Sequence, residues 1–145
     1  MSILSENKVK LGAVATNKFA AIRLAGQLLV DAGHVTPEYV DRMIERENTI
    51  STYMGSGLAI PHGTKDAAKF IKSTGLSIVQ FPAGVPFEDG ELAYLLVGIA
   101  AIGDEHLEIL TNVAMIVSEE ENMERILAAS TPAEMIAIFE SGVGA

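Results

Sequence analysis

The 145-residue chain contains no cysteine, which excludes disulfide bonds, thiolate nucleophiles and metal sites built on cysteine. It is also poor in cations, with ten Lys and Arg against nineteen Asp and Glu and a formal net charge of −9. Because binding to nucleic acid needs clustered cations that neutralise phosphates, we expect no nucleic-acid partner. A partner with a positive patch or an apolar docking surface fits this charge better.

Long apolar runs are missing as well. The longest are LAYLLVGIAAI at 92–102 and LTNVAMIV at 110–117. Both have the length of core elements, whereas a helix that spans a bilayer needs about 20 apolar residues. The first residues, MSILSENKVK, lack the basic-then-apolar layout of a signal peptide. We therefore expect a cytoplasmic protein with no direct membrane insertion.

Hydrophobic residues make up 49% of the chain, enough for a sizeable core, and the length suits one domain. Periodicity and breaker residues predict helices over 17–33, 37–48, 65–72, 105–118, 119–130 and 132–140, strands within 8–15, 74–81 and 91–102, and a Pro- and Gly-rich loop over 82–90. Thr16 is the expected cap of the first helix. We expect one α/β domain over 1–145, with a mixed parallel/antiparallel β-sheet flanked by helices on both faces.

The stretch TYMGSGLAIPHGT at 52–64 places a histidine, His62, between proline and glycine. Pro61 fixes the backbone before the ring, and Gly63 is expected to allow a backbone that other residues resist. The preceding LAI has the character of a buried strand, so His62 is expected at a strand end, where open α/β sheets often form sites. A structural turn histidine that bonds a backbone carbonyl fits the local sequence equally well.

The other two histidines give weaker signals. His34 follows Gly33 in a turn between two helices and is expected to be a solvated loop residue. His106 lies in the first turn of a predicted helix, just after a buried strand. The unpaired N–H groups and the helix dipole of that turn stabilise an anion and disfavour a protonated ring. Taken alone, His106 is best interpreted as a polar residue without a role.

Several chemistries lack the residues they need. His62 and His106 are too few for a metal site, and no third or fourth ligand has a suitable spacing. There is no G-x-S-x-G motif of a serine hydrolase, and the GSG at 55–57 lacks the Lys-Ser/Thr ending of a P-loop. We therefore expect no metal and no cofactor.

A histidine nucleophile remains. A neutral imidazole nitrogen can attack phosphorus and form a covalent phosphoramidate. The rigid turn of Pro61 and Gly63 can hold the ring, and Thr64, Arg46 and backbone amides can donate to the phosphoryl oxygens. The planar guanidinium of Arg46 suits contact with phosphate, although a solvated cation at a helix end is also consistent with its position.

Three stretches together show a family resemblance: YMGSGLAIPHGT at 53–64, PEYVDRMIERE at 37–47 and GIAAIGDEHLEIL at 98–110. They resemble the enzyme IIA components of the bacterial sugar phosphotransferase system, of the mannitol/fructose type and closest to the mannitol-specific branch. The resemblance covers nearly the whole chain. It implies a mixed sheet flanked by helices, with no metal or nucleotide.

The resemblance also implies roles for individual residues. His62 matches the histidine that accepts a phosphoryl group from the phosphocarrier protein HPr and passes it to a cysteine of the IIB domain of the sugar permease. We expect the tele nitrogen, Nε2, to be phosphorylated, although the sequence alone does not separate it from Nδ1. His106 matches a second active-site histidine and Arg46 an active-site arginine, whereas Gly63 and Thr64 belong to the PHGT signature and are assigned to phosphoryl stabilisation.

Three alternatives stay open at this point. The chain could be a fructose-type component, or a regulatory domain of the nitrogen-related branch, in which phosphorylation of the same histidine alters binding to a target protein. It could also be a ligand-binding module in which His62 is only structural. In that last case, substitution of His62 would change stability and abolish no transfer.

Overall fold

The computed structural model describes residues 3–88, 90–103 and 105–143, without the side chains of Glu88, His106, Leu107 and residues 141–143. The elements in chain order are η1 (Glu6–Lys8), β1 (Val9–Lys10), α1 (Lys18–Asp31), α2 (Glu38–Thr49), β2 (Tyr53–Gly55), β3 (Leu58–Ala59), η2 (Lys65–Phe70), β4 (Gly75–Glu88), β5 (Glu91–Ala100), α3 (Glu105–Ser118), α4 (Glu120–Ala128) and α5 (Pro132–Val143).

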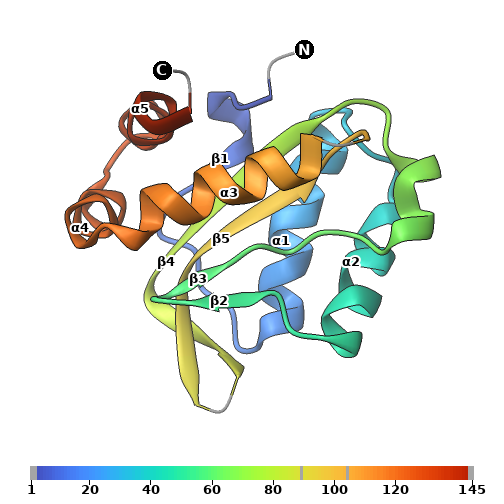
Figure 1. The fold of residues 1–145 in the computed structure, drawn as a ribbon. Coiled ribbons are helices and arrows are strands. Elements are labelled where there is room, and N and C mark those ends of the chain that lie inside the picture. Colours follow the sequence, from blue (N-terminus) through green and yellow to red (C-terminus); the bar gives the residue numbers. More distant parts are fainter. Residues whose placement is uncertain (1–2, 89, 104, 144–145) are drawn as a thin grey trace.

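The strands form one five-stranded mixed sheet in the order β1-β4-β5-β3-β2. β1 runs parallel to β4 and β3 runs parallel to β5, whereas the pairs β4–β5 and β2–β3 are antiparallel. Figure 1 shows α3 crossing one face of the sheet, with α1 and α2 on the opposite face. The predicted fold class, one α/β domain with helices on both faces of a mixed sheet, is therefore confirmed.

Each face of the sheet carries its own hydrophobic core. Along β5, Leu95, Val97 and Ile99 pack with α3, α4 and α5, whereas Leu96 and Ala100 pack with α1 and α2. This alternation explains the nearly unbroken apolar run of β5, because a strand covered on both faces has no side that needs polar residues.

Side-chain caps begin α1 and α5. The Asn17 side chain accepts a hydrogen bond from the Ala20 N–H and begins α1, so the expected cap at Thr16 is wrong by one residue. Thr131 caps α5 by accepting from the Glu134 N–H, with Pro132 as the first helical residue.

The expected loop at 82–90 is also wrong, because β4 continues through Pro82 and Pro86 to Glu88. The pairing register with β5 shifts between Gln80 and Val85 and again between Pro86 and Glu88. Proline cannot donate to a strand ladder, so it is tolerated at such irregularities. The segment expected as a helix at 65–72 is a short 3₁₀ helix, η2.

Candidate functional site

His62 lies beside the carboxyl end of β5. Its segment continues from β3, which runs parallel to β5, and His62 forms an isolated parallel bridge with Ile99. The Ile99 N–H donates to the Pro61 carbonyl at 2.9 Å. The strand-end position predicted for His62 is therefore confirmed, and it is the edge of an α/β sheet where ligands commonly bind.

One hydrogen bond determines the tautomer of the His62 ring. Nδ1 lies 2.8 Å from the carbonyl oxygen of Ile60. A carbonyl oxygen can only accept, so Nδ1 carries the proton and Nε2 carries the lone pair of the neutral ring. This arrangement is compatible with both interpretations that the sequence left open: the ring bonds a backbone carbonyl, and that same bond leaves the lone pair on Nε2.

A pocket of about 600 Å³ opens next to the half-buried His62 ring. Its lining includes side chains from α2, from the segment after His62 and from the segment after β5: Tyr39, Arg46, Thr49, Thr64, Lys65, Ala68, Ile71 and Ala101. Oγ1 of Thr64 is buried and has no hydrogen-bond partner within the described part of the chain. A buried hydroxyl without a partner is costly, and a ligand oxygen in the pocket would satisfy it.

Arg46 comes to this pocket from the last turn of α2. Its guanidinium donates to the carbonyl oxygen of Ile50, the residue at which the chain leaves the helix. Across the residues that the structure describes, Arg46 forms no ion pair with either neighbouring glutamate, because Glu45 pairs with Arg42 and Glu47 pairs with Lys18. The structure therefore brings Arg46, His62, Gly63 and Thr64 to one pocket.

Gly63 is needed for space and not for an unusual backbone. It does not have a positive φ, so the expectation that it adopts a conformation other residues resist is wrong. A Cβ at this position would lie 2.6 Å from Cε1 of Tyr39, closer than carbon atoms approach each other. The glycine thus lets the backbone after His62 pack directly against the Tyr39 ring.

Tyr39 is a site residue that the sequence interpretation missed. Its hydroxyl donates to the Ile99 carbonyl at 2.8 Å and accepts from the Gly63 N–H at 2.9 Å. Burial raises the pKa of Tyr39 to about 12, although the Gly63 bond lowers it, so the hydroxyl stays neutral. Tyr39 lies four residues before the buried Met43 on the same helix, and that spacing was the available signal.

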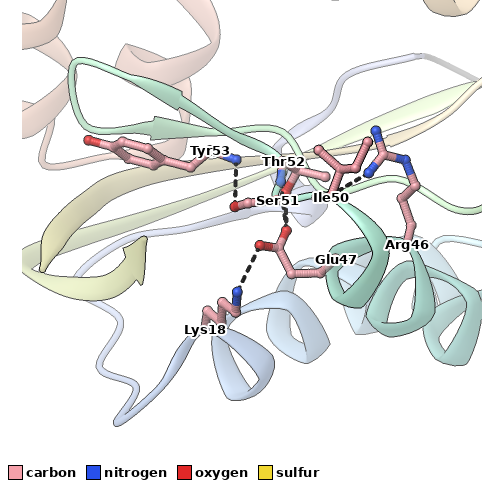
Figure 2. A network of polar contacts seen from close by, with 7 residues as sticks. All are labelled: Lys18, Arg46, Glu47, Ile50, Ser51, Thr52 and Tyr53. Carbon is pink, nitrogen blue, oxygen red and sulfur yellow. Dashed lines mark hydrogen bonds and ion pairs between the residues drawn. The ribbon is translucent and has the colours of Figure 1, made fainter. Parts of the chain in front are cut away.

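Glu47 is a second missed residue, and Figure 2 shows its contacts. Its buried carboxylate accepts from the Thr52 N–H at 2.8 Å and from the Thr52 hydroxyl at 2.6 Å, and its other oxygen lies 3.2 Å from Nζ of Lys18. Burial raises the pKa of Glu47, but bonds from Ser51, Thr52 and Lys18 more than offset this and leave the pKa below its usual value. No local pattern marks a glutamate for burial, because all its partners lie outside its own helix.

The two remaining histidines differ in what can be said of them. His106 is the second residue of α3, but its side chain lies outside the described residues, so its role stays a prediction. His34 is fully buried, and the expected solvated loop residue is wrong. Its Nε2 lies 2.6 Å from Nζ of Lys8 and its Nδ1 lies 2.9 Å from Oγ of Ser73.

Two kinds of feature are absent from the part of the chain that the structure describes. In the described ranges 3–88, 90–103 and 105–143, no three His, Asp or Glu side chains gather as metal ligands. Nor does any helix in those ranges have the length and apolarity needed to cross a bilayer.

Comparison with known proteins identifies the family of the chain. Residues 2–142 match the family described as phosphoenolpyruvate-dependent sugar phosphotransferase system, EIIA 2. The chain is 51% identical to the mannitol-specific phosphotransferase enzyme IIA component of Geobacillus stearothermophilus, over 96% of each chain. It is 47% identical to the corresponding component of Bacillus subtilis, over 96% of this chain and 97% of the other.

Solved structures of enzyme IIA components share this fold. The fold matches enzyme IIA in its complex with phosphorylated enzyme IIB of the Escherichia coli mannitol system, with a TM-score of 0.90 and 36% identity over 95% of this chain and 97% of that one. The crystal structure of IIA mannitol from Escherichia coli matches with a TM-score of 0.87 and 37% identity over 94% and 98% of the two chains. The chain therefore belongs to the EIIA 2 family of the phosphoenolpyruvate-dependent sugar phosphotransferase system and is a phosphotransferase component of that system.

Proposed function

We propose that His62 accepts a phosphoryl group from phospho-HPr at Nε2 and passes it to the cysteine of the IIB domain of a mannitol permease. The protein acts in the cytoplasm, where both partners present their phosphoryl-carrying groups. The mannitol branch is proposed because the most similar relatives described above carry mannitol-specific names. A complex of the Escherichia coli relative with phosphorylated IIB supports the second partner.

The observation that carries this proposal is the bond from Nδ1 of His62 to the Ile60 carbonyl. This bond leaves the lone pair on Nε2, so only Nε2 can act as the nucleophile. When Nε2 bonds to phosphorus, positive charge develops on the ring, and the Ile60 carbonyl stabilises the Nδ1–H that shares this charge. A histidine with only a structural role has no need of a cationic pocket wall beside it.

The transfer consists of two balanced displacements. In the first, the Nε2 lone pair attacks phosphorus as the P–N bond to the HPr histidine breaks, and the donor ring keeps that electron pair. In the second, the thiolate of the IIB cysteine attacks phosphorus and the P–N bond to His62 breaks, which returns the ring to neutrality. Arg46 and the Thr64 hydroxyl donate to the phosphoryl oxygens, which carry the most charge during each displacement.

The surface around the pocket suits a transient partner. Ile50 follows Arg46's helix and is 66% exposed, and Ile102 follows the Ala101 wall of the pocket and is 49% exposed. Together with the net charge of −9, these residues offer apolar contacts within an acidic surface, which complements the basic and apolar residues near the HPr phosphohistidine. Such contacts give a small interface with rapid release.

The experiment that tests the proposal is phosphoenolpyruvate-dependent labelling of the purified chain with enzyme I and HPr, beside a His62→Ala variant. We expect label on the wild type alone, followed by its loss when mannitol IIB is added. Label that stays on the chain with mannitol IIB but moves to fructose IIB would assign the fructose branch. Label that moves to neither would favour the nitrogen-related regulatory role, and equal label on His62→Ala would contradict the proposal.

A further inference from the structure

We propose that Glu47 is a positioning residue for the phosphoryl transfer, because a chain of hydrogen bonds leads from its carboxylate to His62, and the backbone of residues 50–52 links it to the carbonyl that holds Arg46. This inference rests on the function proposed above. Glu47 touches neither reacting group directly, and its side chain has no exposed surface. Any effect on the reaction must therefore pass through the groups that it holds.

The first route leads to the nucleophile. Glu47 fixes Thr52 through two bonds, from the backbone N–H and from the hydroxyl. The Thr52 carbonyl then accepts from the Ile60 N–H at 3.0 Å, and the Ile60 carbonyl accepts from Nδ1 of His62 at 2.8 Å. The Ile60 carbonyl, which selects the His62 tautomer, therefore belongs to a residue that is hydrogen-bonded to Thr52. Thr52 in turn is held to α2 by Glu47.

The second route leads to the cation. The carbonyl that holds the Arg46 guanidinium belongs to Ile50, at the point where the chain leaves α2 in an extended conformation. The next two residues, Ser51 and Thr52, both bond to the Glu47 carboxylate. Figure 2 shows the Thr52–Glu47 bond and the Arg46–Ile50 bond beside the end of the helix. If Thr52 is released, the segment 50–52 can rotate, and the Ile50 carbonyl no longer holds Arg46 toward the pocket.

The hydrogen bonds of Glu47 support a role in positioning Thr52 over a role in packing alone. A buried carboxylate is costly, and an apolar residue of similar volume often stabilises a fold as well or better. Glu47 instead accepts two bonds from one threonine and is balanced by Lys18 at 3.2 Å. A carboxylate with this set of donors fixes the direction of the Thr52 peptide, which packing alone does not do.

The test compares Glu47→Met, which removes every acceptor at similar volume, with Glu47→Gln, whose Oε1 can still accept both Thr52 bonds. The readouts are the His62 ring tautomer by ¹⁵N NMR, and the maximal rate and KM of transfer from phospho-HPr. In Glu47→Met we expect a mixture of tautomers and a maximal rate lower on the order of 10²-fold, the size of effect seen when reacting groups are misplaced. In Glu47→Gln we expect the wild-type tautomer and most of the wild-type rate.

Gln80→Met is the matched control. Gln80 is equally buried and links β4 to the Gly12 N–H and to the Ile126 carbonyl, away from the pocket. It should lower stability without changing the His62 tautomer. An unchanged tautomer and rate in folded Glu47→Met would overturn the inference. If Glu47→Met does not fold, Glu47→Asp, which is one methylene too short to reach Thr52, is measured in the same way and the same unchanged result overturns it.

These outcomes are separable from those of the proposed function. A wild type that takes no label from HPr contradicts the proposed function. The tautomer measurement needs no partner protein, so the effect of Glu47 on the His62 ring is still decided in that case.

Discussion

The Tyr39 hydroxyl accepts a hydrogen bond from the Gly63 N–H at 2.9 Å, which ties α2 to the residue that follows His62. The same hydroxyl donates to the Ile99 carbonyl at 2.8 Å. One buried side chain thus joins the helix that carries Arg46, the segment that carries His62 and the end of β5. The pocket is assembled from three distant parts of the chain, and Tyr39 is where they meet.

Tyr39→Phe should therefore lower both stability and transfer. The substitution leaves a backbone N–H and a buried carbonyl without a partner, a loss of about 1–3 kcal/mol in the free energy of unfolding. Urea unfolding measures this loss, and Tyr94→Phe is the control because the Tyr94 hydroxyl makes no hydrogen bond in the described residues. Equal stability of the two variants would show that the Tyr39 bonds contribute nothing.

Gly63→Ala should disturb the same contact by a different cause. The added Cβ would lie 2.6 Å from the Tyr39 ring, so either the ring or the backbone after His62 must shift. Overpacking of this kind costs about 1–3 kcal/mol. We expect slower transfer together with lower stability, and combining Gly63→Ala with Tyr39→Leu, which removes the ring, should restore part of the lost stability. No restoration would place the clash elsewhere.

Arg46→Ala should slow phosphoryl transfer on the order of 10²–10³-fold, the usual effect of losing one donor to developing charge. Arg46→Lys should recover only part of the rate, because an ammonium cannot reproduce the planar contact of a guanidinium. Rapid-quench measurement of transfer from phospho-HPr decides this. His106→Ala is expected to slow transfer similarly, on the strength of the family resemblance, and an unchanged rate in both alanine variants would make these residues bystanders.

Lys8 should give the protein an alkaline rise in stability. Its buried amine donates to the Ile3 carbonyl and lies beside His34, and burial lowers its pKa from 10.5 to about 8. Between these pH values the folded state binds fewer protons than the unfolded state, so stability rises with pH across the window, and the penalty is fully present below pH 8.

The size of this rise is at most about 3 kcal/mol, from the free energy of a pKa shift. Urea unfolding at several pH values across the window measures it. Lys8→Met should lack the rise, and the difference between the two proteins isolates Lys8 from the tyrosines that both share. Parallel pH profiles of the two proteins would contradict the assignment.

The sequence predicted those features whose causes lie within a few residues of them along the chain. The positions of His62 and Arg46 at one pocket were predictable because Pro61, Gly63 and a helix end mark them within a few residues. The two-faced sheet followed from the apolar run of β5. Tyr39 was missed because the fold brings its partner Ile99 to it from 60 residues away. Glu47 was missed because the lysine that balances its buried charge, Lys18, lies 29 residues before it.

The errors have equally specific causes. Prolines at 82 and 86 indicated a loop, but the irregular register of the β4–β5 pair accommodates them. His34 was expected in solvent because it follows a turn glycine, whereas Lys8 from the N-terminal segment covers it. The contact of Lys8 with His34, 26 residues apart, leaves no trace in the neighbouring sequence.

The most direct test of the central claim is the position of phosphorus on the phosphorylated protein. The chain would be labelled with ¹⁵N in its histidine rings, phosphorylated through enzyme I and HPr, and examined by ¹⁵N and ³¹P NMR at alkaline pH. The bond from Nδ1 of His62 to the Ile60 carbonyl predicts phosphorus on Nε2 of His62, with Nδ1 still protonated. Phosphorus on Nδ1 of His62, or on another histidine, would contradict the account.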